Sequence, residues 1–353
     1  MREWEKNVRK VVPYVPGEQP KNRNIIKLNT NENPYPPSPK VEEALRKMNT
    51  DAIRRYPDPA AERLVNAIAA QHGVSPKQVF PGVGSDDVLA MAFLTFFNSE
   101  KPVLFPDITY SFYDVWADLF RIPYECMPLN ESLEIVKEDY YRENGGVIFP
   151  NPNAPTGVLI PLSEVEDIIS HNRGVIVMVD EAYIDFGGVS AVSLLDRYEN
   201  LLIIRTFSKS RSMAGMRIGY AIGSEELIRC LNDVKYSFNS YTMNEAAICL
   251  GEAAASDREY FEMTRSKIIQ TRERSKKELA TLGFVFPDSC ANFIFAKHEK
   301  VPAKELFEAL KKEGIYVRYF AKPRIDNYLR ITIGTDEEMD ALFDFLRRYL
   351  KNR

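Results

Sequence analysis

Residues 201–223, LLIIRTFSKSRSMAGMRIGYAIG, decide the fold that this sequence predicts. They open with four apolar residues, Leu201–Ile204, which are typical of a β-strand buried on both faces. Lys209 follows within a short polar stretch, and open α/β sheets bind their ligands beyond the carboxyl ends of such strands. A lysine desolvated there can become a neutral amine and form a Schiff base with an aldehyde. A Ser-Lys pair alone is also typical of a solvated loop. The residues at the ends of the other predicted strands must therefore distinguish a Schiff-base lysine from a solvated one.

The composition excludes several classes of protein. A chain of 353 residues predicts one large domain or two, and its formal net charge of -4 favours neither nucleic acid nor an anionic membrane as a partner. No apolar run reaches membrane-spanning length. The three histidines are scattered, so we expect no histidine-based metal site. The four cysteines lack C-x-x-C spacing, which predicts a reduced, cytoplasmic protein.

Four further predicted strands also end in polar or glycine-rich residues. A glycine turn at 82–84 leads into a helix opening near Ser85, where free N–H groups can bind an anion. Asp180 ends the apolar strand Val175–Val179, and a carboxylate buried there needs a cation or several donors. Tyr110 and the proline-rich loop Asn151–Gly157 follow the other two strands. Since helices alternate with these strands, we predict a mainly parallel sheet that gathers all the strand ends at one edge.

The combination fits one cofactor, pyridoxal 5′-phosphate. Its aldehyde requires a lysine, which Lys209 supplies, and a carboxylate such as Asp180 would keep its pyridine nitrogen protonated. A helix N-terminus together with Ser208 and Arg217 would hold its phosphate. The sequence therefore predicts a pyridoxal-phosphate site at the carboxyl edge of the sheet.

The chain resembles the fold-type I pyridoxal-phosphate-dependent transferases, and closely the histidinol-phosphate aminotransferases among them. The resemblance extends from Tyr14 to Gly334 and follows the order of motifs in that family. It implies an α/β fold, in which a large domain holds a mainly parallel mixed sheet flanked by helices and a small α/β domain packs beside it. The motifs that carry it are LNTNENPYPPSP, RRYPDP, GVGSDDVL, NPNAPTG, VDEAYIDF, RTFSKSRSMAGMRIGY and LRITIGT.

The resemblance assigns roles to individual residues. Lys209 would be the Schiff-base lysine, Asp180 the partner of the pyridine nitrogen and Tyr183 a donor to the ring oxygen. Tyr110 would stack on the ring, and Tyr56 would reach in from the partner subunit of a homodimer to cofactor and substrate. The phosphate cup would comprise Gly84, Ser85, Asp86, Thr206, Ser208 and Arg217, a further cofactor contact would be Asn153, and the remaining substrate-binding residues would be Asn33, Arg318 and Arg330.

Two positions depart from the family pattern. Val83 replaces the asparagine of the usual G-N-G-S motif, which we expect to be harmless because the backbone binds there. Ala154 stands where the family generally has an asparagine that touches the ring oxygen. Asn153 or a water molecule could fill that gap, and the sequence leaves the choice open.

The pattern also predicts how the chain is divided. Residues 41–250 would form the large cofactor-binding domain, while residues 1–40 and 251–353 would form an N-terminal arm and the small domain. In the small domain we expect one strand at 315–319 and another at 328–332. Thr335 and Glu338 predict a capping box at the start of the last helix.

The resemblance implies transfer of an amino group between L-histidinol phosphate and 2-oxoglutarate in histidine biosynthesis. Arginines at 318 and 330 would accept phosphate or carboxylate alike. An O-phosphothreonine decarboxylase and an aromatic amino-acid aminotransferase of the same fold therefore stay open as alternatives. A catalytically silent, regulatory pyridoxal-phosphate-binding protein is a further alternative, and the intact Lys209, Asp180 and Arg217 count against it.

Overall fold

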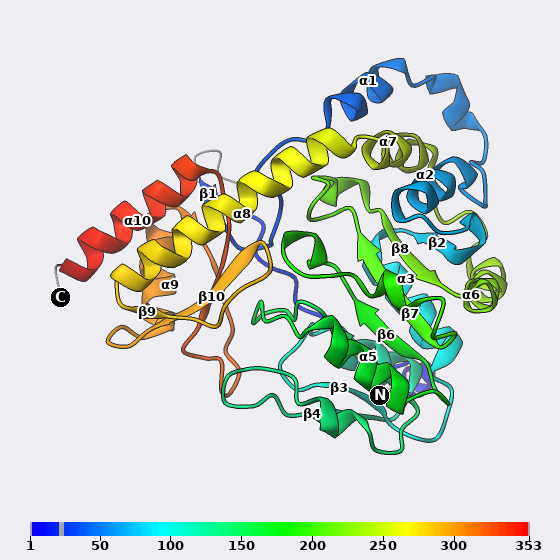
Figure 1. Cartoon of the computed structure of the whole chain (residues 1–353), viewed down its shortest axis with the longest axis horizontal. Coiled ribbons are helices and arrows are strands. Elements are labelled where there is room, and N and C mark those ends of the chain that lie inside the picture. The colour runs from blue at the N-terminus through cyan, green and yellow to red at the C-terminus, as the bar shows by residue number, and fades with distance from the viewer. Residues whose placement is uncertain (1, 21–24, 352–353) are drawn as a thin grey trace.

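A seven-stranded sheet forms the centre of the larger part of the molecule (Figure 1). The computed structural model describes residues 2–20 and 25–351. The strand order is β2-β8-β7-β6-β5-β3-β4, and β8 runs antiparallel to the other six strands, which share one direction. The strands are β2 (Val79–Gly82), β3 (Val103–Pro106), β4 (Tyr124–Met127), β5 (Gly146–Pro150), β6 (Val177–Asp180), β7 (Leu201–Thr206) and β8 (Gly219–Gly223).

Helices cover both faces of this sheet, which explains why β7 is apolar over its first four residues. Leu201 and Ile203 belong to one apolar cluster, whereas Leu202 and Ile204 belong to another on the opposite face. This alternation follows from the two-residue period of a strand. The flanking helices are α1 (Pro39–Lys47), α2 (Glu62–His72), α3 (Gly84–Phe96), α4 (Tyr113–Phe120), α5 (Leu162–His171), α6 (Glu225–Phe238) and α7 (Glu245–Ala255).

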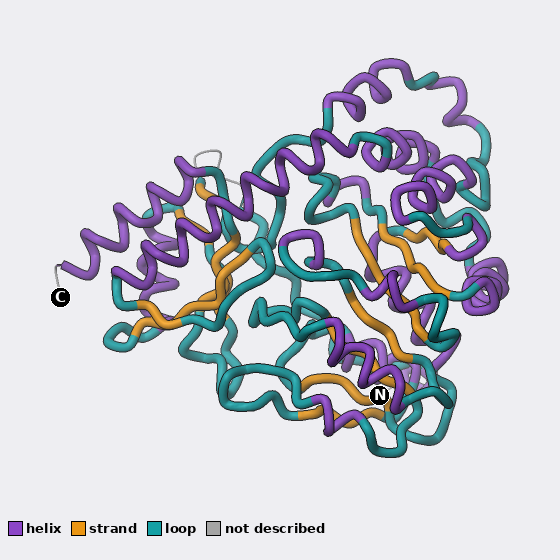
Figure 2. Tube along the Cα trace, in the orientation of Figure 1, coloured by secondary structure: helices purple, strands orange, loops and turns teal. Residues whose placement is uncertain are grey.

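The C-terminal residues build a second, smaller part of the molecule with its own sheet and helices (Figure 2). This smaller part packs around a third apolar cluster. Its antiparallel sheet has the order β12-β13-β10-β9. Figure 1 shows α8 running from the region of α7 to α10, so this one helix connects the two parts. The elements are α8 (Arg258–Thr281), β9 (Phe284–Val285), β10 (Phe293–His298), α9 (Ala303–Lys312), β12 (Arg318–Tyr319), β13 (Leu329–Thr332) and α10 (Asp336–Lys351).

The N-terminal arm joins the smaller part through a short parallel pair. Strand β1 (Ile26–Lys27) pairs with β11 (Ile315–Tyr316), and Leu28 is buried in the third apolar cluster. The single strand predicted at 315–319 is therefore wrong. The chain pairs first with β1 and then, from Arg318, with β13, so that the two halves belong to different sheets.

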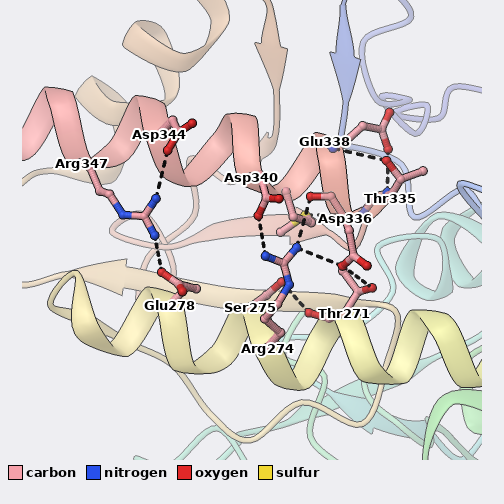
Figure 3. A network of polar contacts seen from close by, with 12 residues as sticks. Thr271, Arg274, Ser275, Glu278, Thr335, Asp336, Glu338, Asp340, Asp344 and Arg347 are labelled. Carbon is pink, nitrogen blue, oxygen red and sulfur yellow. Dashed lines mark hydrogen bonds and ion pairs between the residues drawn. The ribbon is translucent and has the colours of Figure 1, made fainter.

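Several ion pairs join the last helix, α10, to α8 (Figure 3). Arg274 of α8 bridges Asp336 and Asp340 of α10, and Arg347 of α10 pairs with Glu278 of α8 at 2.5 Å. These pairs are partly exposed, so each contributes little to stability. The apolar stripe of α10 contributes more to stability than these ion pairs, because Met339, Leu342, Phe343 and Leu346 are all buried. Across the described ranges, no helix is long and apolar enough to cross a membrane.

The predicted capping box is confirmed. The Thr335 N–H donates to Glu338 Oε2 at 2.8 Å, and the Glu338 N–H donates to Thr335 Oγ1 at 3.3 Å. We expect Thr335→Ala to lower the free energy of unfolding by about 1 kcal/mol, because it removes an N-cap acceptor. Urea unfolding checks this, with Thr281→Ala as the matched control on an exposed helical threonine. Equal losses in the two variants would contradict the cap assignment.

Candidate active site

The strand ends meet at one cavity, as the parallel arrangement predicts. This main cavity has a volume of about 360 Å³, and it is lined by residues at or just after the carboxyl ends of β2, β3, β5, β6 and β7. The N-terminal arm contributes one wall through Thr30 and Glu32. The lining residues among the predicted site are Ser85, Asp86, Tyr110, Asp180, Tyr183, Thr206, Ser208, Lys209 and Arg217, and Ala154 lies among them.

Lys209 extends into the main cavity from the loop after β7. Its Nζ donates to the carbonyl oxygen of Thr30 at 3.1 Å and lies 5.7 Å from the centre of the Tyr183 ring. The residue after it is anchored on two sides. Ser210 Oγ donates to Asp185 at 2.5 Å, and the Ser210 carbonyl accepts from Asn33 Nδ2 at 3.2 Å. The loop therefore holds the lysine at the strand end predicted from the sequence.

Asp180 is a buried carboxylate at the end of β6. Its Oδ2 accepts from the Tyr113 hydroxyl at 2.9 Å, and its Oδ1 accepts from the Ala182 N–H at 3.1 Å. Burial raises the pKa of Asp180 to about 6, although the Tyr113 hydrogen bond opposes that change. Among the described residues no cation pairs with it. A cationic ligand nitrogen at this position would compensate the cost of burying the charge.

A buried ion network connects the segments that carry these groups. Arg205 of β7 pairs with Glu181 at 3.1 Å and with Asp185, and all three side chains are largely buried. Burial opposes the charge on Asp185, but Arg205 and the other donors hold the pKa of this carboxyl below its ordinary value. Because Glu181 adjoins Asp180 and Arg205 precedes Thr206, this network fixes β6 against β7.

The opposite end of the main cavity is suited to an anion. Arg217 lies between Asp86 Oδ2, at 3.0 Å, and Ser208 Oγ, at 3.4 Å, and Thr206 Oγ1 donates to the same serine oxygen at 3.0 Å. Helix α3 begins at Gly84 and points its first N–H groups here. Gly84 has φ +83°, and a Cβ at this residue would clash with the Arg217 guanidinium. Glycine is therefore required where the backbone approaches the anion site.

Asn153 occupies the loop rather than the cavity. Its Nδ2 donates to the Ile108 carbonyl at 2.9 Å and to Thr156 Oγ1 at 3.2 Å, and its Oδ1 accepts from Thr109 at 3.0 Å. Both amide hydrogens are thus used within the protein. Ala154, next to it, lines the main cavity. The arrangement gives no support to Asn153 as the residue that compensates for Ala154.

Two arginines line an adjoining cavity of about 410 Å³ that shares Tyr110, Ala154 and Lys209 with the main cavity. Arg318 and Arg330 lie directly opposite each other on β12 and β13. Arg330 donates from Nη2 to the Asn29 carbonyl at 3.1 Å, while its buried Nε has no partner among the described residues. Burial lowers the pKa of Arg330, and Arg318 lowers it further. Facing like charges are destabilising, so this pair fits an anionic ligand.

Two other predicted residues lie apart from both cavities. Asn33 donates to the Ser210 carbonyl and accepts the Tyr35 N–H at 3.0 Å, so its amide braces the loop of the lysine. Tyr56 is 80% exposed and stacks on Tyr241, with 4.5 Å between the ring centres. A contact of Asn33 with substrate, and of Tyr56 with a second subunit, stay predictions.

Comparison with known proteins identifies the family to which this chain belongs. A family model for aminotransferase class I and II matches residues 23–346. The chain belongs to this family. The sequence of this aminotransferase is 51% identical to that of a histidinol-phosphate aminotransferase of Lactococcus lactis subsp. cremoris. The match covers 99% of this chain and 98% of the relative. It is 53% identical, over 98% of both chains, to the histidinol-phosphate aminotransferase of Clostridium acetobutylicum.

A solved structure extends the comparison to the fold of this aminotransferase. The histidinol-phosphate aminotransferase of Sinorhizobium meliloti, solved in complex with pyridoxal 5′-phosphate, superposes with a TM-score of 0.85 at 24% identity, covering 92% of this chain and 91% of the other. The predicted fold-type I architecture is confirmed by this match and by the family assignment. The predicted enzyme class is confirmed as well, because aminotransferases exchange an amino group between an amine and a 2-oxo acid.

Proposed function

We propose that this aminotransferase moves the amino group of L-histidinol phosphate to 2-oxoglutarate, which gives imidazole-acetol phosphate and L-glutamate in histidine biosynthesis. One observation carries the proposal. Lys209, Asp180, Tyr183 and Arg217 line one cavity, and a pair of arginines lines the cavity that adjoins it. Relatives about half identical over nearly the whole chain bear the name of this activity.

The cofactor we propose is pyridoxal 5′-phosphate. When bound, it supplies an aldehyde for amines and a ring that accepts electrons. The donor set of the main cavity fits it. Asp180 would pair with a protonated ring nitrogen, and the start of α3 with Ser208 and Arg217 would hold the phosphate. Asp86 would contribute its backbone N–H, because its carboxylate pairs with Arg217 and accepts from Tyr110 at 2.7 Å.

Lys209 has the chemical role of moving a proton at the substrate's Cα. Among the described residues that line the main cavity it is the only amine, and the one hydrogen bond of its Nζ within that part of the chain goes to a neutral carbonyl. Arg318 and Arg330 would bind the phosphate of one substrate and a carboxylate of the other in turn, since the guanidinium fork suits both anions. Tyr183 would donate its hydroxyl hydrogen to an oxygen of the bound cofactor.

A homodimer forms part of the proposal. Tyr56 stacks on Tyr241, and Ile53 and Phe238, each three residues before one of them, are exposed as well. A second copy would cover these apolar side chains. Tyr56 would then reach the partner's cavity. We further propose the division into a large domain, 41–250, and a small domain made from both termini. The four free cysteines agree with a reduced, cytoplasmic location.

One experiment tests the substrate directly. L-histidinol phosphate, O-phosphothreonine and phenylalanine are offered separately to the purified enzyme loaded with pyridoxal phosphate. We expect loss of the visible cofactor band and release of a keto product with L-histidinol phosphate. Release of carbon dioxide from O-phosphothreonine would favour a decarboxylase, and preference for phenylalanine would favour an aromatic aminotransferase. No spectral response to any of the three would favour a silent binding protein.

The alanine at position 154 gives a prediction about the cofactor. Since Ala154 lines the main cavity and the Asn153 amide is engaged elsewhere, Ala154→Asn should add a hydrogen-bond donor beside the ring oxygen. A neutral donor contributes about 1 kcal/mol, and one pKa unit is about 1.4 kcal/mol, so the titration midpoint of the bound cofactor should fall by less than about one unit. Absorbance against pH measures it. If Asn153→Ala raises the midpoint while Ala154→Asn leaves it unchanged, Asn153 makes the contact after all.

A further inference from the structure

The hydroxyl of Tyr183 accepts a hydrogen bond from within the protein. Asn31 Nδ2 donates to it at 2.9 Å, and the asparagine is almost fully buried, with 1% of its surface exposed. Tyr183 itself lines both cavities. A phenol carries a single hydrogen. Because the Asn31 amide supplies the hydrogen of this contact, the hydrogen of Tyr183 is free to point to another acceptor.

The orientation of the Asn31 amide follows from its second neighbour. The Asn31 N–H donates to Thr332 Oγ1 at 3.0 Å, and Thr332 Oγ1 in turn donates to Asn31 Oδ1 at 3.0 Å. The oxygen of the amide therefore faces the threonine, and its nitrogen faces Tyr183. The Asn31 carbonyl accepts from Asn292 Nδ2 at 3.0 Å, which fixes the backbone. Its φ of 58° is left-handed, a conformation that asparagine tolerates better than most residues.

We infer that Asn31 is a positioning residue that makes Tyr183 a hydrogen-bond donor into the main cavity, with Thr332 fixing the direction of the Asn31 amide. The acceptor is an anionic oxygen of the bound cofactor, so the inference rests on the proposed function. Two cationic side chains near Tyr183 favour an anion there, against the carboxylates of Glu32, Asp86 and Asp180 in the main cavity. Lys209 Nζ lies 5.7 Å from the Tyr183 ring, and Arg330 lines the adjoining cavity. Ala154 brings no polar side chain to this wall.

The arrangement also connects parts of the chain that are far apart. Asn31 belongs to the N-terminal arm, Thr332 to β13 of the smaller part, and Tyr183 follows β6 of the larger part. The direction of the Tyr183 hydrogen is thus set by residues outside the sheet that carries Lys209 and Asp180. Substitution of Asn31 or Thr332 should therefore shift the titration midpoint of the bound cofactor without changing any group that contacts it.

The test compares absorbance of the cofactor-loaded enzyme against pH in a set of variants. Asn31→Asp replaces the amide donor with an acceptor, so Tyr183 would turn its hydrogen away from the cofactor. We expect the titration midpoint to rise by up to about one unit, in the direction also expected for Tyr183→Phe. Thr332→Val allows the amide to rotate without adding charge, and should give a smaller rise. Both shifts should vanish when combined with Tyr183→Phe.

The double variants distinguish this role from two others. Asn31→Asp also brings a negative charge, and a shift that persists in the Tyr183→Phe background would show a charge effect alone and overturn the inference. Asn172→Asp is the matched control, because Asn172 is buried and donates to the carbonyls of Tyr140 and Ile168 away from the cavities. It should lower thermal stability and leave the midpoint unchanged. An equal shift in this control would indicate general loosening and would also overturn the inference.

The two proposals fail in different ways. If the wild-type enzyme binds no pyridoxal phosphate, the proposed function fails and the inference fails with it. If the cofactor binds covalently but neither Asn31→Asp nor Thr332→Val moves the midpoint, only the inference is overturned. Thr332→Val keeps the test decisive should Asn31→Asp not fold, since it changes a buried hydroxyl and leaves the left-handed residue in place.

Discussion

Replacing Lys209 with alanine should remove nearly all turnover while the protein keeps its fold and binds pyridoxal phosphate without a covalent bond. The cup around Arg217, Ser208 and the start of α3 does not depend on the lysine, so the phosphate would still be held. The amine that we propose to move the proton at Cα would be lost. General acid–base groups contribute about 10²–10⁴-fold, and kcat should fall by at least that much.

Borohydride reduction followed by peptide mapping checks the covalent assignment. In the wild type we expect the label on the peptide that contains Lys209 and no label in the variant. Lys304→Ala is a suitable control, because this lysine is exposed on α9 in the smaller part of the molecule. It should keep both label and turnover. A label on any other lysine would contradict the role given to Lys209.

The position of the residues at strand ends could be predicted from the sequence because a run of apolar residues precedes each of them. Lys209 and Asp180 both follow such a run, and parallel strands bring their carboxyl ends to one edge whatever the details of the loops. The structure places both in the main cavity. The antiparallel direction of β8 could not be predicted in this way, since the apolar pattern of a strand is the same whichever direction the strand runs in the sheet. Nor could the pairing of β1 with β11 be predicted, because both are two residues long.

The supporting residues could not be predicted, for a different reason. Asn31 contacts a tyrosine 152 positions away and a threonine 301 positions away, and nothing local distinguishes it from a turn-forming asparagine. Tyr113 sits in a helix whose neighbours suggest core packing, yet its hydroxyl binds Asp180. Arg205 follows the four apolar residues that open β7, and only the fold shows that it pairs with Glu181 and Asp185. Asn31 and Arg205 both lie within motifs that carry the family resemblance, but those motifs alone do not show what the two residues contact.

Replacing Arg330 with alanine should weaken both half-reactions, because one arginine is proposed to bind the phosphorylated amine and the dicarboxylate in turn. Its Nη2 donates to the Asn29 carbonyl at 3.1 Å, and its Nη1 makes no hydrogen bond with the described residues, so the end of the guanidinium keeps donors for a ligand. A hydrogen bond to a charged group is worth about 1.5–3 kcal/mol, which corresponds to a fall in kcat/KM of about 10- to 150-fold for each substrate.

Two further variants make this prediction specific. Arg330→Lys keeps the charge but loses the planar fork, so it should recover only part of the loss. Arg348→Ala removes an exposed arginine that pairs with Glu313 at 2.8 Å, and should leave both values unchanged. Steady-state kinetics with each substrate varied in turn measures the effect. A loss confined to one substrate would show that the other is held elsewhere, and Arg318, which faces Arg330 across the strand pair, would then be the residue to test.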